Sequence, residues 1–141
     1  MKPILDQLLD YYQSEALDKG RMPLDEMRDY FDILLKNNMI FYELDDQGNL
    51  MALMEIFFLD DSQAHRVVCD GHIYPRGENV TDGNICYVHD VWIRPDHRQN
   101  GGMKIIRGLR KKAEKKHGKK EGILLKEHKY GRFRLFDGRI I

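Results

Sequence analysis

The stretch YVHDVWIRPDHRQNGGMK, residues 87–104, combines residue types and spacings that suit the binding of a phosphate. An apolar strand pattern runs into Gly101 and Gly102 and then into the first residues of a basic helix. The first turn of a helix leaves backbone N–H groups without partners and carries partial positive charge. Glycine lets a ligand approach the backbone, and Arg98 and Lys104 add charge beside it. The spacing predicts an anion site for a pyrophosphate, and a plain tight turn is the alternative that stays open.

A second group of residues has the chemistry of a metal site without its usual spacing. His65, Cys69 and His72 follow an H-x3-C-x2-H pattern, and Cys86 and His89 lie downstream. Sulfur and imidazole ligands would suit zinc, but the two cysteines do not form a C-x-x-C pair. We therefore expect ordinary histidines in a loop and no bound metal.

Positive charge is concentrated in the last third of the chain. Residues 1–97 carry 8 basic and 19 acidic residues, whereas residues 98–141 carry 15 basic and 4 acidic residues. This asymmetry indicates an anionic ligand, or the neutralisation of one face of the fold by another. The basic segment 104–117 would also suit nucleic acid, but no recognised nucleic-acid motif accompanies it. Nucleic acid is therefore the less favoured partner.

The composition suits one compact domain, which we expect to span residues 1–141. Hydrophobic residues make up 42% of the chain and charged residues 33%, which argues against disorder. The longest apolar run, LMALMEIFFL, is too short to cross a membrane, and the first residues do not resemble a signal peptide. Two cysteines do not suggest a disulfide framework. We expect a cytoplasmic protein that makes no membrane contact.

Hydrophobic spacing predicts the elements that position these residues. Apolar side chains at three- and four-residue steps predict helices over 3–18 and 24–37, separated by a turn. Two apolar runs around the turn DDQGN predict a β-hairpin over 39–60. Residues 60–84 are polar, and we expect a long loop there with a short strand near Val67 and Val68.

The second half of the chain alternates strand and helix. We expect a strand over 85–95, a helix over 102–118 and a strand over 122–127. This order implies a parallel, right-handed crossover, whereas the hairpin implies antiparallel pairing. Residues 128–141 fit either a helical turn or a final strand. The predicted fold class is α/β, with a single mixed sheet flanked by helices.

Residues 85–110 resemble the acetyl-coenzyme A binding motif of the GCN5-related N-acetyltransferases, the GNAT family. In that family a strand ends in a hydrophobic-x-hydrophobic-x-Pro step, and an R/Q-x-x-G-x-G/A loop then opens a helix. This sequence has VWIRP over 91–95 and RQNGGM over 98–103. The order of predicted elements over 1–127 is also similar to the family's order. The resemblance implies a GNAT-like fold with a shortened C-terminus.

The sequence departs from the family pattern at three places. Met103 stands where the family prefers Gly or Ala, no clear strand precedes the first helix, and only 14 residues follow the strand over 122–127. Such short, partly degenerate forms look like some small proteins encoded by phages. A non-catalytic module, such as a virion component or an inhibitor of a host function, is therefore the competing hypothesis. In the family a helix and a further hairpin usually follow that strand, and a partner subunit that replaces this hairpin would make a homodimer.

The resemblance implies roles for individual residues. Backbone amides near Val91 and Ile93 would hold the pantetheine arm, and those from Gln99 to Lys104 would cradle the pyrophosphate. His89 takes the place of a family glutamate as the base, with Asp90 beside it, and we expect these two side chains to point to opposite faces of the sheet. The implied cofactor-binding residues are Val91, Trp92, Ile93, Arg98, Gln99, Asn100, Gly101, Gly102, Met103 and Lys104.

The implied reaction transfers an acetyl group from acetyl-CoA to a primary amine by direct attack in a ternary complex. A neutral imidazole near pH 7 suits the base, and Tyr130 is the candidate acid for the departing thiolate. Packing roles for His89 and Tyr130 stay open. The acceptor would be an amine-bearing small molecule, a protein lysine or an N-terminus. Acidic residues of the first two helices would favour a cationic acceptor, unless they only form a solvated face. These residues are Asp6, Asp10, Glu15, Asp18, Asp25, Glu26, Asp29 and Asp32.

Overall fold

The computed structural model describes residues 2–16, 20, 22–70, 79–99, 101–118, 122–127, 132–135 and 139–140. Its sheet has the strand order β1-β2-β3-β4-β5-β6. The elements are α1 (Ile4–Ser14), α2 (Leu24–Lys36), β1 (Ile40–Leu44), β2 (Leu50–Leu59), α3 (Asp61–Asp70), β3 (Ile85–Ile93), the 3-10 turn η1 (Pro95–His97), α4 (Gly102–His117), β4 (Gly122–Glu127), β5 (Arg132–Leu135) and β6 (Arg139–Ile140).

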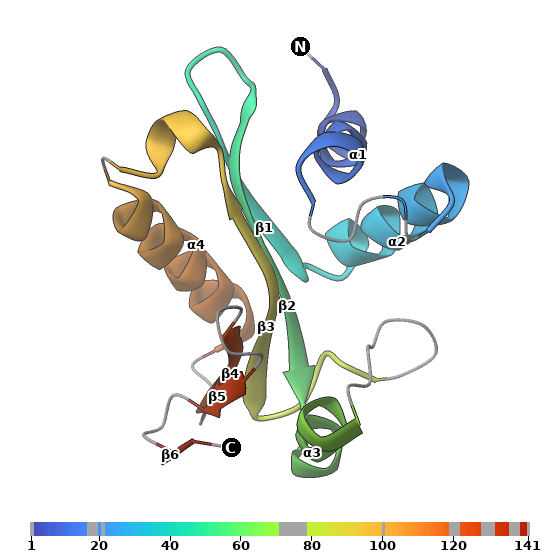
Figure 1. Ribbon diagram of the computed structural model, residues 1–141, viewed down its shortest axis with the longest axis vertical. Helices are drawn as coiled ribbons and strands as arrows, with labels where there is room; N and C mark the ends of the chain where they lie inside the picture. The colour runs from blue at the N-terminus through green and yellow to red at the C-terminus, as the bar shows by residue number, and fades with distance from the viewer. Residues whose placement is uncertain are drawn as a thin grey trace.

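The sheet is mixed, as the sequence predicts. β3 and β4 pair in parallel, and α4 is the crossover between them. The other neighbouring strands pair antiparallel. Figure 1 shows α4 against one face of the sheet and α1 and α2 against the other. The predicted α/β class, with helices on both faces of a mixed sheet, is confirmed.

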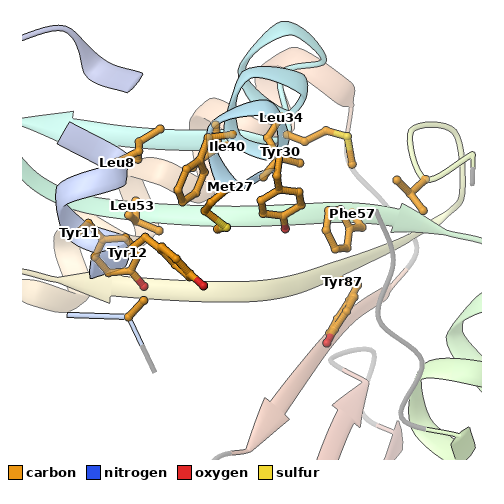
Figure 2. Packing of buried hydrophobic residues seen from close by; sticks show 14 of the residues in the cluster. Leu8, Tyr11, Tyr12, Met27, Tyr30, Leu34, Ile40, Leu53, Phe57 and Tyr87 are labelled. Atoms are coloured by element: carbon orange, nitrogen blue, oxygen red, sulfur yellow. The ribbon is translucent and has the colours of Figure 1, made fainter. Parts of the chain in front are cut away.

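β2 is buried on both faces because it lies between two hydrophobic clusters. Leu53, Phe57 and Leu59 contribute to the larger cluster, which α1, α2 and α3 cover. Met54 and Phe58 contribute to the smaller cluster beneath α4. A strand that is buried on both faces needs a nearly continuous apolar run, which LMALMEIFFL supplies. Figure 2 shows the larger cluster, with side chains from α1 and α2 packed against the strands.

The segment after β2 corrects one prediction, because it forms the helix α3 where a loop with a short strand was expected. Its start is a reciprocal cap: the Gln63 N–H donates to Asp60 Oδ1 at 2.7 Å, and the Asp60 N–H donates to Gln63 Oε1 at 3.0 Å. This is the arrangement of a capping box. Gln63, Ala64 and Val67 form the buried side of the helix, so Val67 packs from a helix and not from a strand.

One element boundary differs from that predicted, and one choice that the sequence left open is decided. α1 ends at Ser14, before the predicted end at residue 18, and Gly20 lies beyond the helix with φ +80°. Near the end of the chain, the choice between a helical turn and a strand is decided for strands, since β5 pairs with β4 and β6 pairs with β5. Residues 128–131 lie outside the described part of the chain.

The turn between β1 and β2 anchors the end of β3. Asp45 accepts hydrogen bonds from the backbone N–H groups of Gln47 and Asn49, both at 2.9 Å. Arg94, directly after β3, donates to the second oxygen of Asp45 at 2.9 Å and to Asp96 at 2.8 Å. The backbone hydrogen bond from Asn49 and the Arg94 guanidinium lower the pKa of Asp45. This contact places the end of β3 and the start of the glycine turn relative to the hairpin.

Candidate functional site

The second half of β3 presents an open backbone edge. β3 pairs with β4 only from Ile85 to Val88, so in the described residues β3 has no strand on that side after Val88. The Arg94 N–H donates to Met51 O on β2 at 2.8 Å. Because successive residues of an antiparallel strand turn their backbone groups to alternate sides, those of Val91 and Ile93 face away from β2. An extended ligand would find hydrogen-bonding partners along this edge.

A β-bulge lies where the open edge begins, and it corrects the predicted orientation of His89 and Asp90. Glu55 of β2 is opposite Asp90, and Ile56 is opposite Val88, so His89 is the extra residue. The bulge breaks the alternation of faces. His89 packs against Phe57, and Asp90 contacts α1, so both side chains reach the face that α1 and α2 cover. They do not point to opposite faces.

The His89 ring lies in an aromatic and acidic environment. Its centroid is 5.2 Å from that of Phe57 and 5.8 Å from that of Tyr87, which it meets edge to face. Its Nδ1 atom is 3.8 Å from Glu55 Oε1. Burial, followed by the charge of Glu55, raises the pKa of Tyr87 to about 12. His89 therefore lies beside two buried, ionisable side chains, those of Glu55 and Tyr87.

Asp90 and Trp92 lie beneath α1. Tyr11 of α1 donates a hydrogen bond from its hydroxyl to Asp90 Oδ2 at 2.6 Å, and its ring centroid is 5.0 Å from that of Trp92. A pocket of about 300 Å³ opens at this point along the edge of β3. Its lining residues are Tyr11, Glu15, Asp90, Val91, Trp92, Ile93 and Arg98. Asp90 is thus the residue next to the bulge that lines this pocket, and His89 is not among the lining residues.

The glycine turn has the geometry of an uncovered helix N-terminus. Gly101 caps α4 with φ +88°, a left-handed conformation, and no described side chain donates or accepts a capping hydrogen bond there. Gly102 is buried, and a Cβ there would lie 3.3 Å from His97 O and from Ile93 Cδ1. Met103 is 68% exposed, and Lys104 is exposed as well. The first N–H groups of α4 therefore begin where the edge of β3 ends.

The remaining predicted site residues lie in different places. Arg98 donates from Nε to Ile93 O at 2.8 Å, which places its side chain across the open edge, and Gln99 is exposed. Asn100 and Tyr130 lie outside the described residues, so their roles stay predictions. The buried indole Nε1 of Trp92 has no hydrogen-bond acceptor within the described part of the chain.

Sequence reasoning missed Glu55, Tyr30 and Tyr11, which come from three elements. Tyr30 of α2 donates a hydrogen bond to Glu55 Oε1 at 2.6 Å, and Glu55 is only 3% exposed. The signal for Glu55 was present, because it is the only charged residue in the run LMALMEIFFL. Tyr11 and Tyr30 carried no such signal, since each also fits the apolar spacing of its helix.

The basic helix α4 keeps most of its positive charge on the surface. Lys112 pairs with Glu43 of β1, and Arg110 pairs with Glu114 one turn away at 3.3 Å. The cations at the exposed positions of the helix are Lys104, Arg107, Arg110, Lys111, Lys112, Lys115 and Lys116. They leave a positive surface that starts at the glycine turn.

The described histidine and cysteine side chains with metal-binding chemistry do not come together as one cluster. Cys69 Sγ lies 3.6 Å from His65 Nδ1, one turn away on α3, and His72 lies outside the described part of the chain. No group of three or more potential metal-binding side chains occurs within the described part of the chain. None of the helices described is long and apolar enough to cross a membrane.

A smaller apolar cavity of about 40 Å³ lies beneath α4. Met54, Ile56, Phe58 and Val88 form much of its lining, on the face of the sheet opposite His89. Its walls offer few polar groups for a substrate. We therefore regard the pocket at the bulge as the candidate site.

Comparisons with solved structures agree on the fold. A predicted acetyltransferase from Clostridium acetobutylicum, solved with acetyl-CoA, is 24% identical with a TM-score of 0.52, covering 91% of this chain and 77% of that one. The GNAT-like decarboxylase GphF, solved with isobutyryl-CoA, is 13% identical with a TM-score of 0.56, covering 86% and 60%. The loading GNATL domain of CurA from Lyngbya majuscula is 16% identical with a TM-score of 0.54, covering 86% and 58%. The chain therefore spans less than two thirds of the length of these last two neighbours.

The sequence comparisons place the chain in a family. No protein of curated function matches the sequence closely enough to count as a relative. The family model that describes the acetyltransferase (GNAT) family matches residues 4–129, which include α1, the β-bulge, the glycine turn and α4. With this match over most of its length, the chain belongs to the GNAT family of acetyltransferases.

Proposed function

We propose that this protein transfers an acetyl group from acetyl-CoA to a primary amine by direct attack in a ternary complex. The observation that carries the proposal is the continuity of the open edge of β3 with the N-terminus of α4. The backbone groups of Val91 and Ile93 face away from β2, and the uncapped first turn of α4 follows after Gly101. A ligand with an amide-bearing arm and a pyrophosphate fits this order of binding groups.

The residues around the bulge supply the proton chemistry. An ammonium has no lone pair, so the acceptor must lose a proton before it attacks the thioester that acetyl-CoA supplies. His89 is suited to take this proton, because an imidazole is neutral and basic near pH 7. Asp90, the next residue along β3, lines the pocket at the open edge and would hold the amine through its carboxylate, and Tyr11 fixes that carboxylate through its 2.6 Å hydrogen bond.

The non-catalytic alternative rested partly on Met103. The side chain of Met103 is 68% exposed, whereas the buried position in the turn is occupied by Gly102. This arrangement supports coenzyme binding, because the residue packed beneath the turn is the small one.

Calorimetric titration with acetyl-CoA tests the proposal. We expect saturable binding to the wild type and at least a tenfold loss of affinity in Gly101→Glu, because the new carboxylate would face the pyrophosphate. Gly101→Ala is the matched control, since it has the same backbone strain without the charge. Isobutyryl-CoA serves as a second thioester, because the neighbour GphF was solved with it. No binding at millimolar acetyl-CoA would contradict the proposal.

An acceptor screen then tests the reaction itself. Polyamines, free lysine and peptides with a lysine or a free N-terminus cover the proposed acceptor classes, and thiol release measures turnover. We expect His89→Ala to lower kcat by at least about a hundredfold, the usual contribution of a general base, while the affinity for acetyl-CoA is retained. If the protein instead binds nucleic acid, with an affinity that falls steeply as the salt concentration rises, a nucleic-acid-binding function of α4 would be favoured.

A further inference from the structure

Glu55 is a carboxylate at the centre of the sheet. It interrupts an otherwise apolar run on β2, and its side chain is 3% exposed. Moving an ionised carboxylate out of water is strongly unfavourable unless the charge is paired and hydrogen-bonded. Leu53 and Phe57, its neighbours on the same face, show that an apolar residue would suit the position. The contacts of Glu55 must therefore explain its presence.

One oxygen of Glu55 faces the side chains of both Tyr30 and His89. Tyr30 donates its hydroxyl hydrogen to Oε1 at 2.6 Å, and His89 Nδ1 is 3.8 Å from the same atom. Glu55 is paired in register with Asp90, directly beside the bulge. His89 follows Tyr87 by two residues and so stays on the face of Glu55, and the bulge brings Asp90 to that face as well.

The remaining contacts hold the imidazole in place. The Phe57 ring packs against it at 5.2 Å with an interplanar angle of 37°, and the Tyr87 ring meets it at 5.8 Å and 82°. Figure 2 shows Phe57 and Tyr87 on the same face as Tyr30. These side chains come from two strands and one helix and not from loops. Rigid elements of this kind fix a catalytic group more closely than loops do.

We propose that Glu55 is a positioning residue that orients His89 and stabilises its protonated form during acetyl transfer. This inference rests on the proposed function. The acceptor ammonium gives one proton to His89 Nε2, on the side of the ring away from Glu55. The neutral amine then forms the N–C bond as the C–S bond breaks, its second proton goes to the coenzyme A thiolate, and His89 releases its proton to solvent.

The charge of Glu55 can be removed without removing the charge of any other side chain described around His89. The ionisable side chains described around His89 are Tyr30 on α2, Glu55 on β2, and Tyr87 and Asp90 on β3, with Tyr11 of α1 bonded to Asp90. A carboxylate within about 6 Å of an imidazole favours the imidazolium. Glu55→Gln removes this charge alone and leaves the charge of Asp90 in place.

Nuclear magnetic resonance of the His89 ring tests the coupling without any turnover. We expect Glu55→Gln to lower the titration midpoint of His89 by about one pH unit, a tenfold change in its proton affinity. Tyr30→Phe is the matched control, because it removes the hydrogen bond to Glu55 and keeps the charge, so the midpoint should stay at or above that of the wild type. An unchanged midpoint in Glu55→Gln would overturn the proposal.

The pH profile of acetylation tests the positioning role. In the wild type, kcat/KM should rise with pH as His89 becomes neutral. In Glu55→Gln this rise should move to lower pH by the same amount as the midpoint, with a lower plateau and an unchanged KM for acetyl-CoA. A partner that only stabilised the fold would not move the profile. A moved midpoint with an unmoved profile would therefore contradict the proposal.

A measurement on the wild type covers the case in which Glu55→Gln does not fold. The carboxyl carbon of Glu55 should show an inflection at the pH at which His89 titrates, since coupled groups report one another's protonation. The absence of this inflection would overturn the proposal. If the inflection is present but no acceptor is acetylated, the proposed function fails and the positioning role fails with it. If the enzyme is active but the inflection is absent, only the positioning role is overturned.

Discussion

Residues 85–88 of β3 have a strand on each side, whereas after the extra residue His89, residues 90–93 pair only with β2 within the described part of the sheet. The first half directs Tyr87 into the larger cluster and Val88 toward the smaller one. The second half begins with the bulge and ends at the glycine turn, and it contains the candidate base and the open edge. One strand therefore joins the core to the proposed coenzyme site, and the change occurs at His89.

The glycines near the two ends of β3 show the same contrast. A Cβ on Gly83 would lie 2.0 Å from the backbone carbon of Leu59, so the strands can approach there only if residue 83 has no side chain. A Cβ on Gly101 would meet nothing within 4 Å, but its φ is +88°. Packing requires the first glycine, and backbone conformation requires the second.

The largest expected effect is at the packed end. Gly83→Ala should destabilise the fold by about 3 kcal/mol or more, since the added carbon meets backbone atoms that cannot move independently. Urea denaturation measures this change. Gly108→Ala is the control: it lies within α4 with no atom near its Cβ, so it should stabilise the fold by roughly 0.5–1 kcal/mol. Equal free energies of unfolding for Gly83→Ala and Gly108→Ala would contradict the packing requirement at Gly83.

Alkaline pH should also lower the free energy of unfolding, through Tyr87 in the half of β3 that pairs with both β2 and β4. Burial raises the pKa of Tyr87 to about 12, so its neutral form contributes stability that is present below pH 10 and is lost as the pH rises toward 12. Over this interval the wild type should lose roughly 2 to 3 kcal/mol that Tyr87→Phe does not lose. Urea titrations from pH 9 to 12 measure the difference, and parallel losses in the two proteins would exclude this origin.

Gly101→Ala should have an intermediate effect, from backbone strain alone. A left-handed conformation costs a residue with a Cβ about 1–2 kcal/mol, and no steric clash adds to it. Gly20→Ala is a matched control with φ +80° and no neighbouring atom. Thermal melts should give the two variants similar losses of stability. A much larger loss for Gly101→Ala would show that the turn is packed and not open.

The smallest effects compare two valines of β3. Val88 is partly buried and packs against the cluster beneath α4, whereas Val91 on the open half is 40% exposed. Val88→Ala should cost about 1 kcal/mol, and Val91→Ala should change stability by less than about 0.5 kcal/mol. Urea denaturation of both variants tests whether the open half contributes as little to the core as its exposure indicates.

The local pattern of the sequence determined most of the elements. The helices near 4–14, 24–36 and 102–117 follow from apolar spacing, and the strands from alternating or continuous apolar runs. α3 was missed because residues 60–84 are mostly polar, although the reciprocal pair of Asp60 and Gln63 at its start has the spacing of a capping box. The glycine turn and its basic flank were also readable, because positive φ and helix N-termini are local properties.

The sequence could not determine which side chains surround His89, because that depends on pairing between distant segments. The bulge exists only through the register of β2 against β3, where Glu55 is opposite Asp90 and Ile56 is opposite Val88. That register reverses the predicted orientation of Asp90 and brings Glu55, Tyr30 and Tyr11 to the site from three separate elements. A side chain's direction along one strand is set locally, but an inserted residue is defined only against its partner strand. The tertiary structure therefore decided which ionisable side chains surround His89.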